Sequence, residues 1–384
     1  MKHFYLTLLS ASLLIALSSS PAAAQEESTP EEEVESGAVV CPPQAYLAPP
    51  ESCMPLGPSA YLSRMAQMGL TFPQRPLPIY RPSPELVKIP YHYFKLNPEA
   101  VEVYPSLVDA ISKTGYSQVF PAGFVYVSYI DRTDTGHGVY YMLPSAEWIP
   151  GKGARVSEIS NFQGLLFSST PHNAFGWAFE DIPVKSAAGY NAPNTRQRIS
   201  PFTVVQVYSS QSVDDAEWNL IGPDRWVEAR KVATVTPLTM PPQGVNDGRW
   251  IEVNLAEQTL AVYENGQLVF ATMVASGMDP FWTKPGLFQI FKKNEAEDMR
   301  GSDPADFYYL QNVPWTMYYD QSRALHGAYW RTRFGYPQSH GCVNLSVGDA
   351  RWLFDWAKEG DWVYVHDPSG LTPTDPALYG VGAP

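Results

Sequence analysis

Two histidines and a cysteine near the end of the sequence have the types and spacing for nucleophilic chemistry. His326 precedes the run Ser339-His340-Gly341-Cys342, so all three side chains fall within 17 residues. A thiolate attacks carbonyl carbons far better than a thiol does, and an imidazole can take the thiol proton. Gly341 permits a tight turn whose backbone N–H groups can face a developing oxyanion. The segment therefore predicts nucleophilic catalysis by Cys342 with an imidazole as the base.

This segment resembles the catalytic motif of the L,D-transpeptidases, the YkuD-type domain. That family carries a His, a spacer and then Ser/Thr-His-Gly-Cys, and His326 precedes Ser339–Cys342 by a fitting gap. The run Thr283-Lys-Pro-Gly-Leu-Phe288 resembles the family's Thr-Pro-x-Gly-x-Phe strand, with a Lys where Pro often stands. The resemblance extends over residues 249–366 and does not involve the chain before Arg249.

The resemblance implies a role for each catalytic residue. Cys342 would be the nucleophile, and His326 the general base and then the acid. The carbonyl of Gly327 would orient the imidazole. Backbone N–H groups around Gly341 and Cys342 would form the oxyanion hole. His340 would support the loop and help to position the substrate.

The resemblance also implies substrate-binding residues around the cysteine. These are Trp330, Ser339 and Asn344. Many members carry Arg at the second position after the cysteine, where this chain has Asn344. A subset of the family shares this Asn, so activity is still expected, but the partner of the substrate carboxylate is left open.

The reaction implied by the resemblance is peptidoglycan L,D-transpeptidation. Cys342 would cleave the terminal D-Ala from a stem tetrapeptide, and an amine of a second stem would attack the thioester to give a 3-3 cross-link. No cofactor is needed, and carbapenem-type inhibitors are expected to acylate the cysteine. With the same nucleophile, water would give an L,D-carboxypeptidase, a free D-amino acid would give exchange, and a protein lysine would give anchoring. A wall-binding protein with an inactive site is a further alternative, against which the complete motif argues.

Zinc binding is another alternative for the same residues. His340 and Cys342 share a face if they lie on a strand, and with His326 and His366 they could hold a zinc ion. The pattern lacks a paired cysteine, so we expect no metal site.

Composition narrows the class of protein. Of the 384 residues 45% are hydrophobic, which excludes a disordered chain. The net charge is −13 and no basic run is present, so binding to nucleic acid through its phosphates is not expected. The 36 prolines and the 13% aromatic content favour β-rich modules with rigid turns.

Local patterns predict how the motif is positioned. Residues 250–255 alternate as a half-buried strand does, and residues 258–274 read as two strands joined at Asn265-Gly266. Another strand is expected after Pro285-Gly286, a helix over 347–358 and a last strand over 361–366. These elements and the resemblance predict a catalytic β-sandwich over 249–366 with one late helix, followed by a tail over 367–384.

An internal repeat precedes this domain. The segment from Tyr140 to Trp148 matches the segment from Trp218 to Trp226, 78 residues later, and each follows a β-rich run. We predict two small β-barrels that resemble bacterial SH3-like modules, over 85–165 and 166–236, and a linker over 237–248. Their tryptophans would either contact glycan or fill the barrel cores, and the core interpretation is favoured.

The N-terminal residues indicate export. Residues 1–24 combine a polar start, an apolar run over 4–17 and small residues at Ala22 and Ala24, as a secretory signal peptide does. An uncleaved anchor is less expected because the apolar run is short. Residues 25–84 form an acidic and Pro-rich linker with a short helix near 61–68. Within it, Cys41 and Cys53 are either a local disulfide or two unpaired thiols. The expected location is the cell wall or a periplasm-like space.

Overall fold

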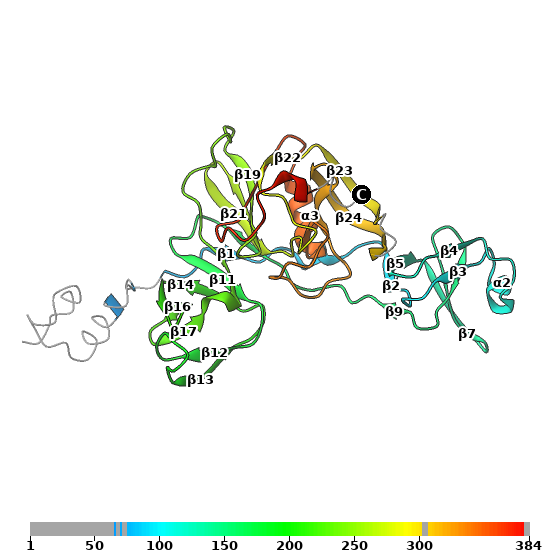
Figure 1. Ribbon diagram of the computed structural model, residues 1–384, viewed down its shortest axis with the longest axis horizontal. Coiled ribbons are helices and arrows are strands. Elements are labelled where there is room, and N and C mark those ends of the chain that lie inside the picture. Colours follow the sequence, from blue (N-terminus) through cyan, green and yellow to red (C-terminus); the bar gives the residue numbers. More distant parts are fainter. Residues whose placement is uncertain (1–64, 67–69, 71–74, 302–305, 380–384) are drawn as a thin grey trace, which may run out of the picture. The chain divides into compact units, whose positions relative to one another are not determined.

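The computed structural model describes residues 65–66, 70, 75–301 and 306–379. Strands dominate these residues (Figure 1), which confirms the mainly-β prediction. The predicted signal peptide, the acidic stretch and the Cys41–Cys53 pair lie outside the described residues. Of the helix expected near 61–68, residues 65–66 are described and are helical. None of the helices in the described part of the chain is long and apolar enough to cross a membrane.

The first sheet of the catalytic segment contains the strands predicted from local patterns. Its order is β1-β10-β21-β20-β19-β27-β22. The bounds are Ile79–Tyr80 for β1, Leu165–Phe167 for β10, Arg249–Asn254 for β19, Thr259–Glu264 for β20, Gln267–Met273 for β21, Gly286–Gln289 for β22 and Trp362–His366 for β27. Asn265 and Gly266 join β20 to β21 with φ of 53° and 75°, as a tight hairpin turn requires.

The second sheet carries the catalytic motif. Its order is β26-β25-β24-β5-β2-β9, and β23 also pairs with β24. The bounds are His92–Lys95 for β2, Phe124–Tyr129 for β5, Arg155–Val156 for β9, Lys292–Arg300 for β23, Tyr308–Asp320 for β24, Arg323–Gly327 for β25 and Val343–Leu345 for β26. One core joins the two sheets and includes Ile251 and Val262 from the first and Leu325 and Val343 from the second. The predicted sandwich is confirmed.

Helix α3 covers this core, and it is the predicted late helix (Figure 1). It runs Val347–Trp356, two residues shorter than predicted, and buries Ala350 and Leu353. Ser346 caps it by accepting from the Asp349 N–H at 3.2 Å. The Asp349 carboxylate accepts from Gly164 N at 2.8 Å and from Thr272 Oγ1 at 2.6 Å. Burial raises the pKa of Asp349 to about 6, although these hydrogen bonds oppose the rise.

The internal repeat corresponds to two segments with matching strand pairing. In the first, β2 pairs with β5 and β9; in the second, β11 pairs with β14 and β18. The hairpins that contain the repeated segments keep the same register. Tyr140 is the register partner of Pro150 in the first, and Trp218 is that of Glu228 in the second, each 78 residues later. The further bounds are Val101–Val103 for β3, Leu107–Ser112 for α2, Gln118–Phe120 for β4, Asp131–Thr135 for β6, Gly138–Met142 for β7, Trp148–Pro150 for β8, Ala174–Ala178 for β11, Ile182–Lys185 for β12, Asn194–Ile199 for β13, Val204–Val207 for β14, Ser209–Val213 for β15, Ala216–Gly222 for β16, Arg225–Glu228 for β17 and Val232–Val235 for β18.

The tryptophans of the repeat pack into small cores. Trp218 is 2% exposed. Trp148 packs beside Tyr104 and Tyr140, and Trp226 packs beside Leu220. Since apolar burial accounts for these rings, the core interpretation fits them better than glycan contact. The SH3-like identity and the limits of the two modules stay predictions.

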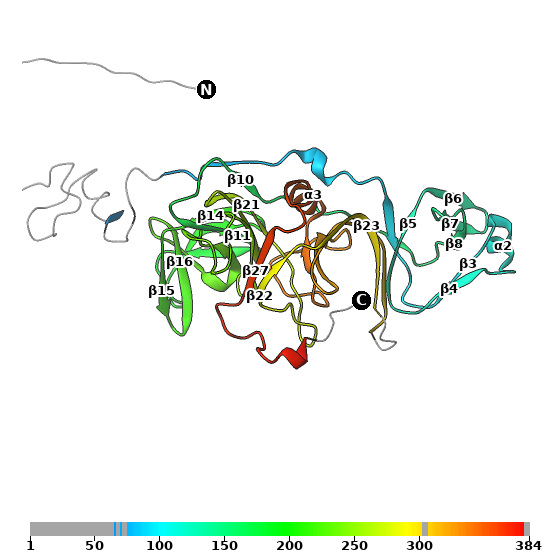
Figure 2. The ribbon, with the colours of Figure 1, turned by 90° about the horizontal axis from the view of Figure 1, so that it is seen from above.

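Both repeat segments are joined to the catalytic segment. Strand β5 pairs in parallel with β24, with Phe124 opposite Tyr308, and so lies across β24 from β23 (Figure 2). Strand β10 pairs with β21, and β1 pairs with β10, so a strand lies inside the predicted linker over 25–84. Trp177 packs in one cluster with Trp250. Sequence periodicity did not indicate these pairings, because it shows which side chains share one face of a strand and not which strands pair with each other.

Short 3-10 helices complete the described structure, and one lies in the predicted tail. They run Pro84–Val87, Ala229–Lys231 and Pro376–Leu378. In the tail, Asp367 accepts hydrogen bonds from Ser369 and Thr372, and the carbonyl of Tyr379 accepts from the Arg323 guanidinium. The described part of the tail is therefore attached to the catalytic sheet.

Candidate active site

One cavity collects most of the residues singled out in the sequence. Its volume is about 240 Å³. Six predicted residues line it: His326, Trp330, Ser339, His340, Cys342 and Asn344. The other described lining residues are Phe124, Met299, Asp306, Tyr308, Leu310, Arg331 and Gln338. Gly327 and Gly341, the remaining predicted residues, act through their backbones, as described below.

The pairing of two short parallel strands brings the histidine and the cysteine together. In β25 and β26, Leu325 lies opposite Val343 and His326 lies opposite Asn344. Cys342 immediately precedes β26, so its sulfur enters the cavity beside the strand that carries His326. The intervening loop returns over the cavity and supplies Trp330 to its wall.

Cys342 holds a neutral thiol at rest. Its Sγ–H donates to the carbonyl of Ser322, with Sγ and O 3.7 Å apart. The residue keeps partial solvent exposure, yet protein atoms surround the sulfur closely. Burial raises the pKa of the Cys342 thiol to about 11, while the Ala324 N–H and the Arg323 charge act in the opposite direction.

His326 is a neutral base with a defined tautomer. It is 2% exposed, and its Nδ1 lies 3.4 Å from the carbonyl oxygen of Gly327. Because a carbonyl can only accept, Nδ1 carries the proton in this contact and Nε2 keeps its lone pair. Nε2 lies 3.2 Å from Nδ2 of Asn344, which donates to it. Burial lowers the pKa of His326 to about 4; the hydrogen bond to the Gly327 carbonyl opposes this shift, and the charge of Arg331 adds a small part of it. The resting pair is therefore thiol and imidazole, not an ion pair.

The turn before the cysteine is held by the Ser339 hydroxyl. It donates to the Cys342 carbonyl and accepts from the Gly341 N–H at 3.1 Å. Gly341 has a φ of 115°, a conformation that glycine adopts without strain. The expectation that the Gly341 N–H belongs to the oxyanion hole does not fit this arrangement, because Ser339 already occupies that donor. The Cys342 N–H stays the candidate donor.

Thr283 supports the same turn from the other side. Its hydroxyl donates to the Gly341 carbonyl at 2.8 Å and accepts from the Gly277 N–H at 2.8 Å. A side chain at Gly277 would meet the Phe281 carbonyl oxygen at 2.1 Å, so only glycine fits there. The run that begins at Thr283 thus contacts the catalytic turn directly.

His340 lies at the exposed side of the cavity. Its Nε2 is 2.7 Å from Oδ2 of Asp306. Its ring packs 4.7 Å from that of Phe281 and 4.9 Å from that of Tyr308, measured between centroids. This fits a residue that supports the loop and faces the substrate rather than one that takes the Cys342 proton.

Arg331 is a site residue that the sequence reasoning missed. Its Nε donates to Oδ1 of Asn344 at 2.6 Å, and its Nη1 donates to Oε1 of Gln338 at 3.0 Å. Burial lowers the pKa of Arg331 to about 10, so the guanidinium stays charged at neutral pH. One sequence signal could have indicated it. An arginine lies between His326 and Cys342, in a chain that has Asn344 where many members of the resembled family have Arg.

The four residues of the zinc alternative do not meet at one site. His366 pairs with Glu252, with Nε2 and Oε1 2.9 Å apart, and it does not line the cavity. Within residues 65–66, 70, 75–301 and 306–379, no group of three or more His, Cys, Asp or Glu side chains is arranged to hold a metal ion.

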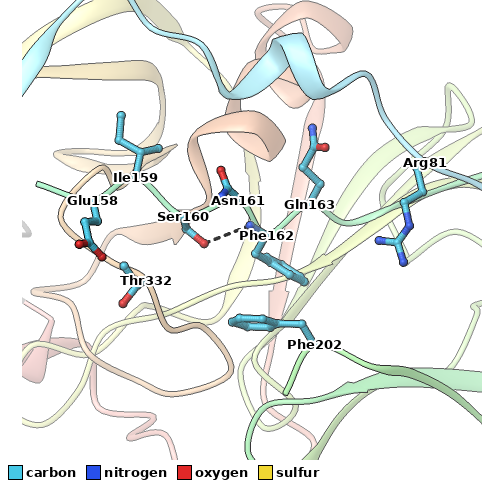
Figure 3. A pocket seen from close by; sticks show the side chains of 9 residues that line it. All are labelled: Arg81, Glu158, Ile159, Ser160, Asn161, Phe162, Gln163, Phe202 and Thr332. Carbon is cyan, nitrogen blue, oxygen red and sulfur yellow. Dashed lines mark hydrogen bonds between the residues drawn. The ribbon is translucent and has the colours of Figure 1, made fainter. Parts of the chain in front are cut away.

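A second cavity, of about 400 Å³, lies where the repeat segments meet the loop after Trp330 (Figure 3). Its walls include Arg81, Glu158 and Thr332. The rings of Phe162 and Phe202 face each other 4.9 Å apart, and Phe162 is 7% exposed. Phe162 therefore presents little free aromatic surface to a sugar, and the Ser160 hydroxyl at this cavity accepts from the Phe162 N–H at 3.2 Å.

Comparison with known proteins gives a consistent result. Residues 248–365 match the model of the L,D-transpeptidase catalytic domain, YkuD. YciB of Bacillus subtilis (strain 168), a curated relative, is 25% identical over 121 residues, which are 28% of this chain and 59% of YciB. An L,D-transpeptidase (Yku) structure from Stackebrandtia nassauensis is 30% identical, covers 32% of this chain and 58% of that one, and has a TM-score of 0.27. The catalytic domain of the E. faecium L,D-transpeptidase acylated by ertapenem is 26% identical, covers 32% and 100%, and has a TM-score of 0.30. The family match confirms the resemblance that the motif indicated.

Proposed function

We propose that this chain, whose residues 248–365 form an L,D-transpeptidase catalytic domain, is an exported cysteine acyltransferase that makes 3-3 cross-links between peptidoglycan stem peptides. The observation that carries the proposal is the placement of Cys342 and His326 in one cavity by the register of β25 and β26. The substrate expected from the resemblance is a stem tetrapeptide that ends in D-Ala.

In the acylation step, the Cys342 sulfur forms a bond to the carbonyl carbon before the terminal D-Ala. The thiol proton passes to Nε2 of His326 at the same time, because the resting thiol and imidazole are both neutral, and the Asn344 amide releases its hydrogen bond to Nε2 for this transfer. The C–N bond then breaks, and the leaving nitrogen takes this proton from His326. A thioester on Cys342 and free D-Ala result.

The tetrahedral intermediate of this step carries a negative oxygen that needs a donor. The Cys342 N–H is the remaining candidate of the two backbone donors expected there, since Ser339 engages the Gly341 N–H. The bonds from Ser339 and Thr283 hold the turn in place, so the donor need not reorganise during the reaction.

In the second step, an amine of another stem peptide attacks the thioester carbonyl. His326 takes a proton from this neutral amine, the C–S bond breaks, and His326 passes that proton to the departing sulfur, which restores the thiol and the neutral imidazole. The product is an amide between the third residues of two stems. Water in place of the amine would release a tripeptide acid, which is the outcome that distinguishes a carboxypeptidase.

Export is part of the proposal and is supported by the signal-like residues 1–24. The mass of the mature chain, purified from the extracytoplasmic fraction of an expressing bacterium, tests it. Cleavage after Ala24 is expected, and a full-length chain retained in the membrane would contradict it.

Intact mass spectrometry of the mature chain tests the chemistry. The protein is incubated with a carbapenem and, separately, with tetrapeptide muropeptides. We expect one covalent adduct and a cross-linked product, both absent from Cys342→Ala. The double variant Cys41→Ser/Cys53→Ser is the matched control, because it retains only the proposed nucleophile and should still form the adduct.

Replacement of His326 is expected to slow acylation, whereas replacement of Cys342 should abolish it. His326→Ala is expected to slow acylation by about 10²–10⁴-fold, the usual contribution of a positioned acid–base group. Cross-linking by folded Cys342→Ala would refute the assignment of the nucleophile. A folded wild-type chain that forms neither adduct nor product would leave the domain without transpeptidase activity.

A further inference from the structure

The active-site cavity contains a cation that the mechanism above does not use. Arg331 lines the cavity and is charged at neutral pH. Its hydrogen bonds go to neutral groups, namely Oδ1 of Asn344 and the side-chain and backbone oxygens of Gln338. No carboxylate of the described residues forms an ion pair with it. A largely enclosed guanidinium that has no ion-pair partner among the described residues favours an anionic ligand.

The geometry leaves donors free for such a ligand. A guanidinium has five N–H groups, and its hydrogen bonds to described residues use one each on Nε, Nη1 and Nη2. One N–H on Nη1 and one on Nη2 are left over. A carboxylate, with two oxygens, matches a pair of N–H groups on an arginine.

The position of Arg331 indicates which carboxylate it can reach. Asn344 bridges the guanidinium to Nε2 of His326, so only two hydrogen bonds separate the cation from the base. His326 must deliver its proton to the nitrogen of the leaving residue. In a peptide that ends at this residue, the free carboxylate is two bonds from that nitrogen.

We propose that Arg331 binds the terminal carboxylate of the acyl donor and so selects peptides that end one residue after the attacked carbonyl. This inference rests on the proposed function. The ligand class is the α-carboxylate of a leaving amino acid. A donor that is longer by one residue places its carboxylate too far from Arg331, and an amidated donor has no charge to pair.

Three donor peptides test the proposal: a tetrapeptide acid, its C-terminal carboxamide, and a tetrapeptide acid whose diamino-acid side-chain carboxylate is amidated. The kcat/KM for release of the terminal residue is measured by mass spectrometry. For wild type we expect a preference of about 10–100-fold for the acid over the C-terminal carboxamide, the usual contribution of a hydrogen bond to a charged group. The side-chain amide should react like the acid.

Variants assign this preference to the guanidinium. In Arg331→Gln the acid-to-carboxamide ratio should fall close to one, and Arg331→Lys should give an intermediate ratio because it keeps charge but loses the fork. Arg333→Gln is the matched control, because Arg333 is an exposed arginine of the same loop that does not line the cavity. Alkylation of Cys342 and the melting temperature confirm that each variant retains its site.

Binding measured without turnover separates this inference from the proposed function. In the Cys342→Ala background, calorimetry compares the acid with the C-terminal carboxamide, with and without Arg331→Gln. If the protein binds the acid more tightly than the carboxamide only when Arg331 is present, the inference is supported. A wild type that shows this binding but no turnover would count against the proposed function alone. A wild-type ratio near one, a ratio unchanged in Arg331→Gln, or a preference that follows the side-chain carboxylate would overturn it.

Discussion

The Asn344 side chain donates a hydrogen bond to Nε2 of His326 across 3.2 Å, at the nitrogen that must receive the Cys342 proton. The resting site therefore holds its base with an amide and not with the thiol. Asn344 must yield this position when the sulfur attacks. The same amide also accepts from Arg331, so its orientation is fixed from two sides.

Removal of this amide tests its role as a positioning residue. Asn344→Ala is expected to lower kcat by about 10–100-fold, because His326 loses the partner that fixes its ring. The folded state should persist, since the imidazole still has Gly327 as a partner. Steady-state kinetics and the melting temperature give the two readouts. An unchanged kcat in the folded variant would show that Asn344 does not position the base.

The pH dependence of thiol alkylation reports the protonation state of the nucleophile. With a Cys342 pKa of about 11, about one molecule in 10⁴ carries a thiolate at pH 7. The rate of reaction with iodoacetamide should therefore rise about tenfold per pH unit from pH 7 to pH 9. A rate that is already constant across this range would mean that the thiol is ionised at rest. Catalysis should fail on the acid side, below the His326 pKa of about 4, where the base is protonated.

Thr283 provides a test of the support beneath the catalytic turn. Thr283→Val keeps the shape but leaves the buried Gly341 carbonyl and Gly277 N–H without their partner. A loss of about 2 kcal/mol or more in unfolding free energy is expected, together with lower activity. Thr283→Ser keeps the hydroxyl and should lose only about 1 kcal/mol, the value of a buried methyl group. Urea titrations of the two variants give the comparison, and equal losses would contradict the hydrogen-bond argument.

Asp349 should make stability depend on pH. Its folded pKa of about 6 exceeds the usual value of 3.8, so the native state holds a proton that the unfolded chain has released between these values. Stability contributed by this group is therefore present below pH 3.8 and is lost as pH rises to about 6, by about 3 kcal/mol in all.

Two variants separate this charge effect from the hydrogen bonds. Asp349→Asn should remove the decline between pH 4 and pH 6 while it keeps an acceptor for the Gly164 N–H. Asp349→Ala should destabilise the protein at every pH, because the Gly164 N–H and the Thr272 hydroxyl lose their partner. Melting temperatures across this pH range provide the test. The same slope in the Asn variant and in wild type would assign the pH dependence to other groups.

Local signals in the sequence predicted the elements of the catalytic segment. The Asn265-Gly266 turn, the alternation after Trp250 and the apolar face of the late helix are each encoded within about a dozen residues, and each was confirmed. The family motif in turn indicated which residues line the cavity.

Long-range partners were not predictable in this way. Arg331 belongs to the site because the loop places its Nε against Asn344, which depends on tertiary packing. The engagement of the Gly341 N–H by Ser339 is likewise a matter of turn geometry. Strand β1 was missed because two residues carry no readable period and because the partner strand, β10, is more than 80 residues away.

Phe124 lies on β5, opposite Tyr308 of β24, and both residues line the cavity around Cys342. One wall of the site is thus encoded far upstream of the motif. A recombination event that transferred residues 248–365 alone to another gene would leave this wall behind. The two portions are therefore expected to be inherited together, and substitutions in the upstream portion provide a route by which selection can alter donor preference without changing the nucleophile or its base.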